Sequence, residues 1–268
     1  MYLDNKGTTV QLMRTHDQAV QDQFGPQSQA YLGSAVHAQG PDLAHARRLV
    51  ESSVSQSEAA LDVGCGAGHL SFALAPSCRR LVALDPSPGM LKTVAQAAAA
   101  RGLPQIETRI GSAEALPFGD ASFDLVATRF SAHHWRSVED GLREMSRVLK
   151  PSGRLLVIDS LGAEDPLVDT HLQAIELLRD PSHVRNRSAG QWRSLLEAAG
   201  LLDIEPMQWP LRLEFASWVR RMRTPPTHVT VIRELQRNAA REVHDALAYE
   251  ADGSFTLRTG SFWARKPG

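Results

Sequence analysis

The stretch Leu61-Asp62-Val63-Gly64-Cys65-Gly66-Ala67-Gly68 decides the fold of this chain. A short apolar run ends here, three glycines follow within five positions, and a helix-like pattern begins after them. Glycine adopts backbone angles that other residues avoid, and it lets the chain approach a bound molecule closely. In a parallel sheet, such a strand-to-helix turn lies at the carboxyl ends of the strands, where ligands bind. We therefore predict a cofactor site at this turn; a tight turn without a ligand is the alternative.

Outward from this turn, strand-like and helix-like patterns alternate along the chain. Apolar residues between Ser137 and Leu149 recur at three- and four-residue spacing, and Lys150-Pro151-Ser152-Gly153 ends that helix. Similar helix-like segments fill most of the gaps between short β-rich runs, which is typical of a parallel sheet with crossover helices. The β-rich runs are residues 59–63, 80–85, 105–110, 123–128 and 154–160. This alternation predicts an α/β fold.

The pattern changes after residue 160. Insertions in such a fold often cover the mouth of a binding site. We expect helices at 164–180, 189–199 and 214–249, a strand at 203–209 and a last strand at 254–265, antiparallel to its neighbour. The segments 161–187 and 211–250 are the predicted acceptor-pocket insertions.

The chain suits a single domain. Its 268 residues can bury one sizeable core, and 43% apolar with 22% charged residues is a globular composition. We divide it into an N-terminal helical segment that covers the cofactor (1–57), a cofactor-binding core (58–160) and the rest of the sheet with its insertions (161–268).

Charge and composition exclude several classes of function. Lys and Arg total 29 against 30 Asp and Glu, and a net charge of −1 gives no general attraction to nucleic acid or anionic membrane. The first residues lack the pattern of a signal peptide, and no stretch is long and apolar enough to span a bilayer. We expect a cytoplasmic protein with a small-molecule partner, no nucleic acid partner and no stable membrane insertion. A homodimer is among the assemblies that the sequence allows.

The residues around the glycines discriminate between cofactors. The dinucleotide fingerprint G-x-G-x-x-G, read from Gly64, requires a third glycine at position 69, which is His69. Asp62 would repel the pyrophosphate of NAD, whereas S-adenosylmethionine (SAM) carries ammonium and sulfonium groups that gain from a nearby carboxylate. Both observations favour SAM.

Asp85 stands at the end of the next β-rich run, Leu81-Val-Ala-Leu-Asp85. One carboxylate can accept hydrogen bonds from both hydroxyls of a ribose, so Asp85 supports a nucleoside cofactor. NAD enzymes use such an acid as well. The alternative is a cap for the turn Asp85-Pro86-Ser87-Pro88, and Met90 packs either on an adenine face or on the core.

Five motifs follow one another in order: Leu61-Asp-Val-Gly-Cys-Gly-Ala-Gly68, Ala83-Leu-Asp-Pro-Ser87, Gly111-Ser-Ala-Glu-Ala-Leu-Pro-Phe118, Phe123-Asp-Leu-Val126 and Arg147-Val-Leu-Lys-Pro-Ser-Gly-Arg154. Together they resemble class I SAM-dependent methyltransferases, and most closely the type 11 group of ubiquinone and menaquinone C-methyltransferases. The resemblance is strong over residues 58–160. It implies a Rossmann-like fold with a mostly parallel seven-stranded sheet, helices on both faces and an antiparallel last strand.

The resemblance also implies roles for single residues. The backbone of Gly64 and Gly66 would hold the methionine part of SAM beside Asp62, and Asp85 would take the ribose hydroxyls. The other predicted cofactor-binding residues of these two turns are Cys65, Gly68, Pro86 and Met90.

The adenine end and the rim of the predicted site depart from the family pattern in places. Ala113 would offer its amide to the adenine ring, and Ser112 stands where the family commonly has Asp, so its hydroxyl would accept from the adenine amino group. Tyr31 resembles an element that closes over SAM, with a purely structural Tyr as the alternative. Arg129 would offer its carbonyl to the SAM ammonium group or its side chain to an acidic substrate.

His133 and His134 stand where the family places its acceptor-facing groups. An imidazole titrates near neutral pH and can remove a proton from a phenol or an activated carbon acid. We predict one of them as a catalytic base, with packing or capping at a helix start as the alternative. His183, in Asp180-Pro-Ser-His-Val-Arg185, is a weaker candidate. The tetrapeptide [N/D]-P-P-[Y/F] of the family's amino-group methylators is absent, which argues against DNA-base or protein-glutamine methylation.

These observations predict a SAM-dependent methyltransferase that methylates carbon or oxygen of an aromatic, quinone-like or lipophilic metabolite and releases S-adenosylhomocysteine (SAH). No metal is expected, because no clustered carboxylates follow the fourth strand and Cys65 and Cys78 form no metal pair. The aromatic residues considered for the acceptor pocket, each with the core as its alternative, are Trp135, Trp192, Trp209 and Trp218. A non-catalytic SAM-binding module or partner subunit is one alternative function. A NAD-dependent oxidoreductase is another, against which His69 and the lack of a Tyr-x-x-x-Lys pair argue.

Overall fold

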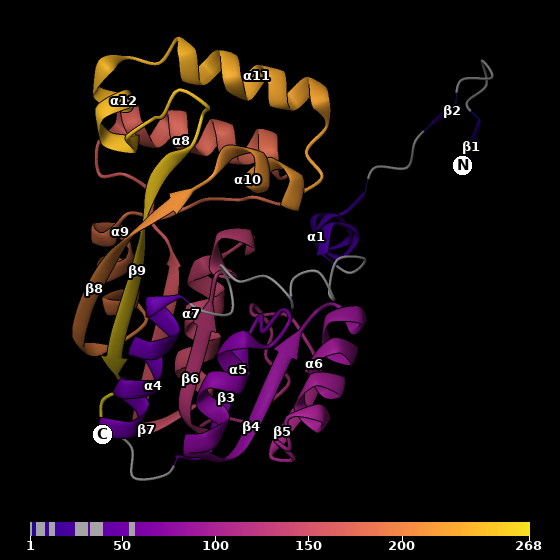
Figure 1. Cartoon of the computed structure of the whole chain (residues 1–268). Coiled ribbons are helices and arrows are strands. Elements are labelled where there is room, and N and C mark those ends of the chain that lie inside the picture. Colours follow the sequence, from indigo (N-terminus) through magenta and orange to yellow (C-terminus); the bar gives the residue numbers. More distant parts are fainter. Residues whose placement is uncertain (1, 4–8, 11–13, 25–31, 33–39, 54–56) are drawn as a thin grey trace.

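A computed structural model of the chain describes residues 2–3, 9–10, 14–24, 32, 40–53 and 57–268 (Figure 1). A seven-stranded sheet forms its centre, with the strand order β5-β4-β3-β6-β7-β9-β8. The strands are β1 (Tyr2–Leu3), β2 (Thr9–Val10), β3 (Ser57–Val63), β4 (Cys78–Asp85), β5 (Ile106–Ile110), β6 (Phe123–Arg129), β7 (Leu149–Ser160), β8 (Leu202–Leu213) and β9 (Phe255–Arg265). The helices are α1 (His16–Phe24), α4 (Pro41–Ser53), α5 (His69–Leu74), η2 (Ala75–Ser77), α6 (Pro88–Ala100), η3 (Ala132–His134), α7 (Val138–Val148), α8 (Pro166–Arg179), α9 (Ala189–Ala198), α10 (Phe215–Arg221), α11 (Pro226–Arg237) and α12 (Arg241–Leu247).

The sheet is parallel from β5 through β7 and antiparallel at its other end. β9 pairs antiparallel with both β7 and β8, so the last strand of the chain lies between two earlier ones. The predicted α/β fold, with a mostly parallel seven-stranded sheet and an antiparallel last strand, is confirmed. Two helices begin at side-chain caps: Ser87 accepts from the backbone of Met90, and Ser188 with Gln191 forms a capping box.

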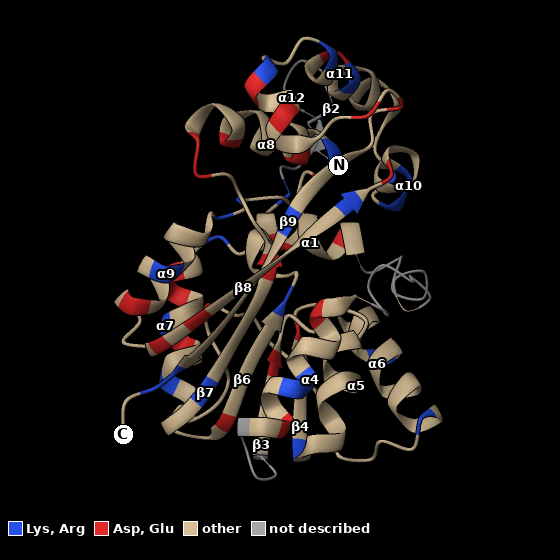
Figure 2. Ribbon diagram, turned by 60° about the vertical axis from the view of Figure 1, so that its left-hand side comes forward, with Lys and Arg blue, Asp and Glu red and all other residues tan. Residues whose placement is uncertain are grey.

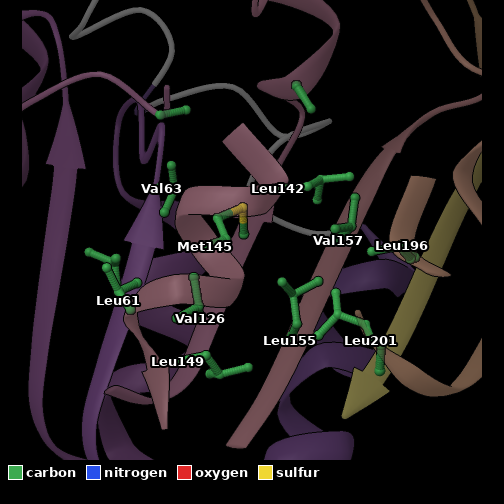
Figure 3. Packing of buried hydrophobic residues seen from close by; sticks show 14 of the residues in the cluster. Leu61, Val63, Val126, Leu142, Met145, Leu149, Leu155, Val157, Leu196 and Leu201 are labelled. Carbon is green, nitrogen blue, oxygen red and sulfur yellow. The ribbon is translucent and has the colours of Figure 1, made fainter. Parts of the chain in front are cut away.

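Both faces of the sheet are buried because apolar residues occupy both sides of the parallel strands. In β4, Leu81 and Ala83 belong to the core that α4, α5 and α6 cover, whereas Val82 and Leu84 belong to the core beneath α7 and α9. Figure 3 shows the second of these cores, where Met145 of α7 lies between strands and helix. The two layers of helices hold the strand ends, and with them the site, in a fixed place.

A third apolar cluster forms a cap above the carboxyl ends of the parallel strands (Figure 1). It joins α8, α10, α11 and α12 to the ends of β8 and β9. The predicted helical stretch 214–249 is therefore present as three short helices, separated by turns at 222–225 and 238–240. The first three residues of the predicted insertion 211–250, residues 211–213, instead end the strand β8.

One predicted boundary is wrong for a local reason. The strand expected from residue 154 begins at Leu149, because Leu149 already pairs with Phe123 of β6. The next pair of residues is Leu125 with Arg154. The residues of the expected turn, 150–153, therefore form an irregularity inside β7. Ser152 has a φ of 61° at this point. The Pro-Ser-Gly segment bends the chain as expected, but it does not delay the strand.

The described helices of the N-terminal segment are α1 and α4. α4 packs on the sheet core, and α1 lies close to the carboxyl ends of the central strands (Figure 1). Among the described residues, no helix combines the length and apolar character needed to cross a membrane.

Candidate active site

The glycine turn lies at the carboxyl end of β3 and requires glycine at two positions in particular. Gly64 has a φ of 68°, and a Cβ there would collide with the Ser131 hydroxyl. Gly68 has a φ of 87°, and a Cβ there would lie 2.8 Å from the Phe72 ring. The amides of Gly64 and Cys65 both donate to the carbonyl of Leu84. The turn is thus locked against β4 and leaves its outer face to the cavity beside it.

Asp62 is buried at the end of β3 and uses only one of its oxygens. The Ser71 hydroxyl donates to Oδ2 at 2.6 Å, whereas Oδ1 is buried and has no hydrogen-bond partner among the described residues. Burial raises the pKa of Asp62 to about 7, although Ser71 and Arg129 act in the opposite direction. An unsatisfied carboxylate oxygen is costly, so this one suits a donor that the protein itself does not supply.

Asp85 connects the two turns. The amide of Gly66 donates to its Oδ2 at 2.9 Å, and the amide of Ser87 donates to its Oδ1 at 2.8 Å. Burial raises the pKa of Asp85 to about 6. The turn-capping contact considered for Asp85 is therefore present, and each oxygen keeps a lone pair for a further donor.

Arg129 ends β6 and makes a contact that the sequence did not reveal. Its Nε donates to Asp42 of α4, and both side chains are about 95% buried. The second terminal nitrogen, Nη2, has no hydrogen-bond partner among the described residues. The two residues are 87 positions apart, and no local pattern connects them. The guanidinium group is therefore held in place by Asp42, and its Nη2 atom is left without an acceptor among the described residues.

Ser112 is engaged with its neighbour Glu114. Its hydroxyl donates to Glu114 Oε2 at 2.5 Å and accepts from the Glu114 amide. Glu114 Oε1 accepts from the amide of Arg136. The acid next to Ala113 is thus Glu114, which the sequence analysis did not single out although it lies inside a quoted motif.

The two predicted base candidates differ sharply in their surroundings. His133 Nδ1 lies 2.6 Å from Asp159 Oδ1, and the His133 amide donates to Asp159 Oδ2 at 3.1 Å. Burial lowers the pKa of His133, but the charge and hydrogen bond of Asp159 outweigh it, so the pKa is raised. Burial and the neighbouring His133 lower the pKa of His134 to about 4. Asp159 lies at the carboxyl end of β7, as Asp62 lies at the carboxyl end of β3. An acid at a strand end is thus the sequence signal that could have identified Asp159 as a site residue.

His183 is an unsuitable base. Its Nε2 lies 2.9 Å from Gln173 Oε1, and burial with the nearby histidines lowers its pKa to about 2. It belongs to the lining of neither cavity described below.

Two adjacent cavities lie above the sheet. The first, of about 210 Å³, borders the glycine turn and is closed on one side by His16, Val20 and Phe24 of α1. The second, of about 100 Å³, lies beneath the cap. Both are bordered by Phe24, Phe130 and His134, so they meet at these side chains.

The structure gathers nearly all predicted cofactor residues around the first cavity. Its lining includes Asp62, Gly64, Cys65, Gly66, Asp85, Pro86, Met90, Ser112, Ala113 and Arg129. Gly68 lies behind it, against Phe72. Tyr31 lies outside the described residues.

The second cavity brings together residues that were largely missed. Of the two predicted base candidates, His133 lines only this cavity and His134 lines both. Trp218 lines the second cavity and Trp135 the first, whereas Trp192 is in the sheet core and Trp209 packs against His45. The charged and amide residues of its wall, none of them selected by the sequence analysis for a role, are Glu176, Arg179, Asp180, Asn186 and Arg221.

Residues 61–157 match the methyltransferase domain of the type 11 family. The chain is 48% identical over 193 residues to the protein YafE of Escherichia coli, covering 72% of this chain and 93% of that one. It is 33% identical over 222 residues to the methyltransferase YcgJ of Bacillus subtilis, covering 83% of this chain and 87% of that one.

Solved structures agree with the sequence relatives. The crystal structure of YcgJ superposes with a TM-score of 0.78 at 31% identity, covering 84% of this chain and 99% of that chain. A methyltransferase of Bacillus halodurans superposes with a TM-score of 0.81 at 29% identity, covering 85% and 100% of the two chains. The chain belongs to the class I SAM-dependent methyltransferases of the type 11 family. It is therefore an enzyme of the methyl-transferring class, as the sequence analysis predicted.

Proposed function

We propose that the first cavity holds SAM and that the methyl group passes to a small molecule in the second cavity. The observation that carries this proposal is a pair of unsatisfied buried atoms beside the glycine turn: the acceptor Asp62 Oδ1 and the donor Arg129 Nη2. The methionine part of SAM carries an ammonium group and a carboxylate. One acceptor and one donor, both charged and both at the same cavity, complement these two groups.

The remaining walls fit the rest of the cofactor. Asp85 would accept from the ribose hydroxyls with the lone pairs that Gly66 and Ser87 leave free. Met90 and Ala113 would border the adenine ring, with Glu114 rather than Ser112 supplying the negative charge nearby. Ser112 keeps only part of its predicted acceptor role, because its oxygen already accepts from the Glu114 amide.

The N-terminal helix α1 would cover the bound cofactor. Its side chains line the first cavity, and it is tied to the site at both ends. His16 Nε2 lies 2.8 Å from the carbonyl of His134, and the Gln23 side chain donates to the carbonyl of Met222 in the cap. Such a cover excludes water from the transfer. This supports the proposed division into a covering segment, a cofactor-binding core and a capped remainder.

His133 is the proposed base. Its Nδ1 faces Asp159, so Nε2 is the nitrogen that would accept a proton from the methyl acceptor. The Asp159 carboxylate fixes the ring orientation and stabilises the imidazolium that forms. His134, with its low pKa and its Nδ1 toward Ser182, would serve as part of the wall between the cavities.

SAM supplies a methyl group on a sulfonium centre, which leaves as an uncharged thioether. The protein then has to position the acceptor, remove one proton and exclude water. Methylation of oxygen or carbon on an aromatic, quinone-like or lipophilic metabolite stays a prediction. A small-molecule acceptor is supported by the second cavity, which adjoins the first. Figure 2 shows acidic and basic residues mixed over the ribbon, in keeping with the net charge of −1.

Calorimetric titration tests the cofactor assignment. We expect SAM and SAH to bind one site and NAD to show no binding under the same conditions. Tight binding of NAD without binding of SAM or SAH would overturn the proposal. The exposed Arg220→Gln variant is a control for loss of charge away from the cavity and should bind SAH as the unmodified protein does.

A further inference from the structure

The second cavity contains buried carboxylates whose bonding is incomplete. Asp159 is fully engaged: its oxygens receive the His133 ring, the His133 amide and the Ser160 amide. Glu176 and Asp180 differ, because each uses one oxygen only. Arg179 pairs with Glu176 Oε2, and the Ser182 amide and hydroxyl donate to Asp180 Oδ1. No described residue donates to Glu176 Oε1 or Asp180 Oδ2.

These two carboxyl groups are deeply enclosed. Glu176 is 6% exposed and Asp180 is 2% exposed, yet both border the cavity. Burial raises the pKa of Glu176 although Arg179 and His133 counteract it. A buried carboxylate with a free oxygen is costly unless a cation or a donor completes its surroundings.

The two carboxylates of this wall are not equally paired with cations. A base must be uncharged before it accepts a proton, so His133 contributes no charge at that stage. The charged residues that border this cavity, apart from the histidines, are the acids Glu176 and Asp180 and the arginines Arg179 and Arg221. Arg179 pairs with Glu176 and donates to the Trp218 carbonyl, whereas Asp180 has no ion-pair partner among the described residues.

Two further side chains of this wall have buried nitrogen atoms without a hydrogen-bond partner among the described residues. Asn186 is 2% exposed and its Nδ2 has no hydrogen-bond partner among the described residues. Trp218 is 1% exposed, and its Nε1 likewise has no hydrogen-bond partner among the described residues. Both residues border the second cavity. They offer donors for an oxygen atom, in addition to the carboxylates that accept from a nitrogen cation.

We infer that the methyl acceptor carries an amine cation, which Glu176 and Asp180 bind, and an oxygen that the Asn186 and Trp218 donors meet. The inference rests on the proposed function, since it places the acceptor in the second cavity. It replaces the lipophilic or quinone-like class expected from sequence with a polar amino alcohol or aminophenol class. Phe24, Phe130 and Leu257 leave an apolar side for the carbon frame of such a molecule.

The experiment compares three probes of equal size on the SAH-saturated protein at pH 8. Ethanolamine is a cation, ethylene glycol is neutral and glycolate is an anion. The indole N–H signal of Trp218, assigned with the Trp218→Phe variant, reports binding by NMR. We expect ethanolamine to shift this signal saturably, with a Kd at least about tenfold below that of ethylene glycol, and glycolate not to bind.

The variants locate the effect. Glu176→Gln and Asp180→Asn should each reduce the preference for ethanolamine over ethylene glycol, whereas the exposed control Glu205→Gln should keep it. Equal binding of the cation and the neutral probe by the unmodified protein, or preference for glycolate, would overturn the inference, and neither result depends on a variant that folds. Failure of SAH itself to bind is seen separately by calorimetry and would count against the proposed function instead.

Discussion

The two cavities of this enzyme are built from very different parts of the chain. Apart from α1, the first cavity is lined by residues between Asp62 and Trp135, which lie at or beyond the ends of the four successive parallel strands β3, β4, β5 and β6. The second cavity combines Phe24, His133, Glu176, Leu211 and Leu257, which come from five separate elements or turns. A cavity made of consecutive strand ends leaves a readable pattern, because each turn carries its own glycine or acid. A cavity made of distant segments does not.

The difference also appears in bonding. At the first cavity, the unsatisfied atoms are one acceptor on Asp62 and one donor on Arg129, which match an amino-acid zwitterion. At the second, Glu176 and Asp180 each keep one carboxylate oxygen without a donor among the described residues, which favours an amine. If this comparison holds, substitutions at one cavity should alter SAH affinity, and substitutions at the other should alter turnover or acceptor binding.

The largest effect is expected at the base. His133→Ala should lower turnover by about 100- to 10,000-fold while SAH binding stays within about twofold, since His133 does not line the first cavity. Turnover is measured as SAH formed with an accepted acceptor. Because His183 lines neither cavity, His183→Gln serves as the matched control. Full turnover by His133→Ala would mean that His133 is not the base.

The pH profile sharpens this test. Asp159 raises the pKa of His133, and the imidazole is a base only when neutral, so the rate should rise with pH through a pKa above 6.5. Asp159→Asn removes the charge that raises this pKa, so the rising limb should move to lower pH while the maximum rate falls. An unshifted limb would assign the ionisation to another group.

The next effect concerns the amino-acid end of the cofactor. Arg129→Gln should weaken SAH binding by about 10- to 100-fold because a charged hydrogen bond is lost. Methylthioadenosine lacks the whole amino-acid part and should bind the variant as it binds the unmodified protein. Calorimetry measures both. Equal losses for the two ligands would mean that Arg129 acts only through its ion pair with Asp42 on the structure of the site.

Asp85, unlike Arg129, should affect the binding of both ligands. Asp85→Ala should weaken SAH and methylthioadenosine alike, by about 1–3 kcal/mol each, because both ligands contain the ribose. The thermal midpoint of the variant should be recorded as well, since Asp85 also accepts from Gly66 and Ser87. Unchanged affinity for both ligands would leave Asp85 as a turn cap alone.

The smallest effect is a proton count. Asp62 has a pKa of about 7 in the free protein, and a neighbouring ammonium group favours its charged form. SAH binding near pH 6.5 should therefore release a fraction of one proton, seen by calorimetry in buffers of different ionisation enthalpy. Methylthioadenosine, which has no ammonium group, should release none, and Asp62→Asn should abolish the release. Proton uptake would contradict the placement of the ammonium group at Asp62.

Asp62 also ties stability to pH. Its folded pKa lies above the unfolded value of 3.8, so the protonated form is favoured in the fold. That contribution is complete below about pH 4 and is lost as the pH rises through about 7. In the absence of cofactor, Asp62→Asn should flatten this part of the stability curve, which chemical denaturation at several pH values would measure.

Much of the fold was predictable because its signals are local. Alternating runs, the glycine turn and the caps at Ser87 and Ser188 depend on residues a few positions apart. The start of β7 was misplaced because pairing with Phe123, which no local pattern expresses, extends the strand through Pro151. The first break of the 214–249 stretch lies at Pro225 and Pro226, a local signal that the prediction missed, and its three helices pack onto α8 and the ends of β8 and β9.

The sequence by itself determined the sheet, the glycine turn and the acids Asp62 and Asp85, because a strand end and its turn are encoded by adjacent residues. Only the tertiary structure decided that Asp42 holds Arg129, that Asp159 rather than a neighbour of His133 in sequence orients that ring, and that the cap brings Glu176 and Asp180 to the acceptor side. Such partners are many residues apart, and side-chain contacts across that separation form only when the packed sheet and cap bring the segments together.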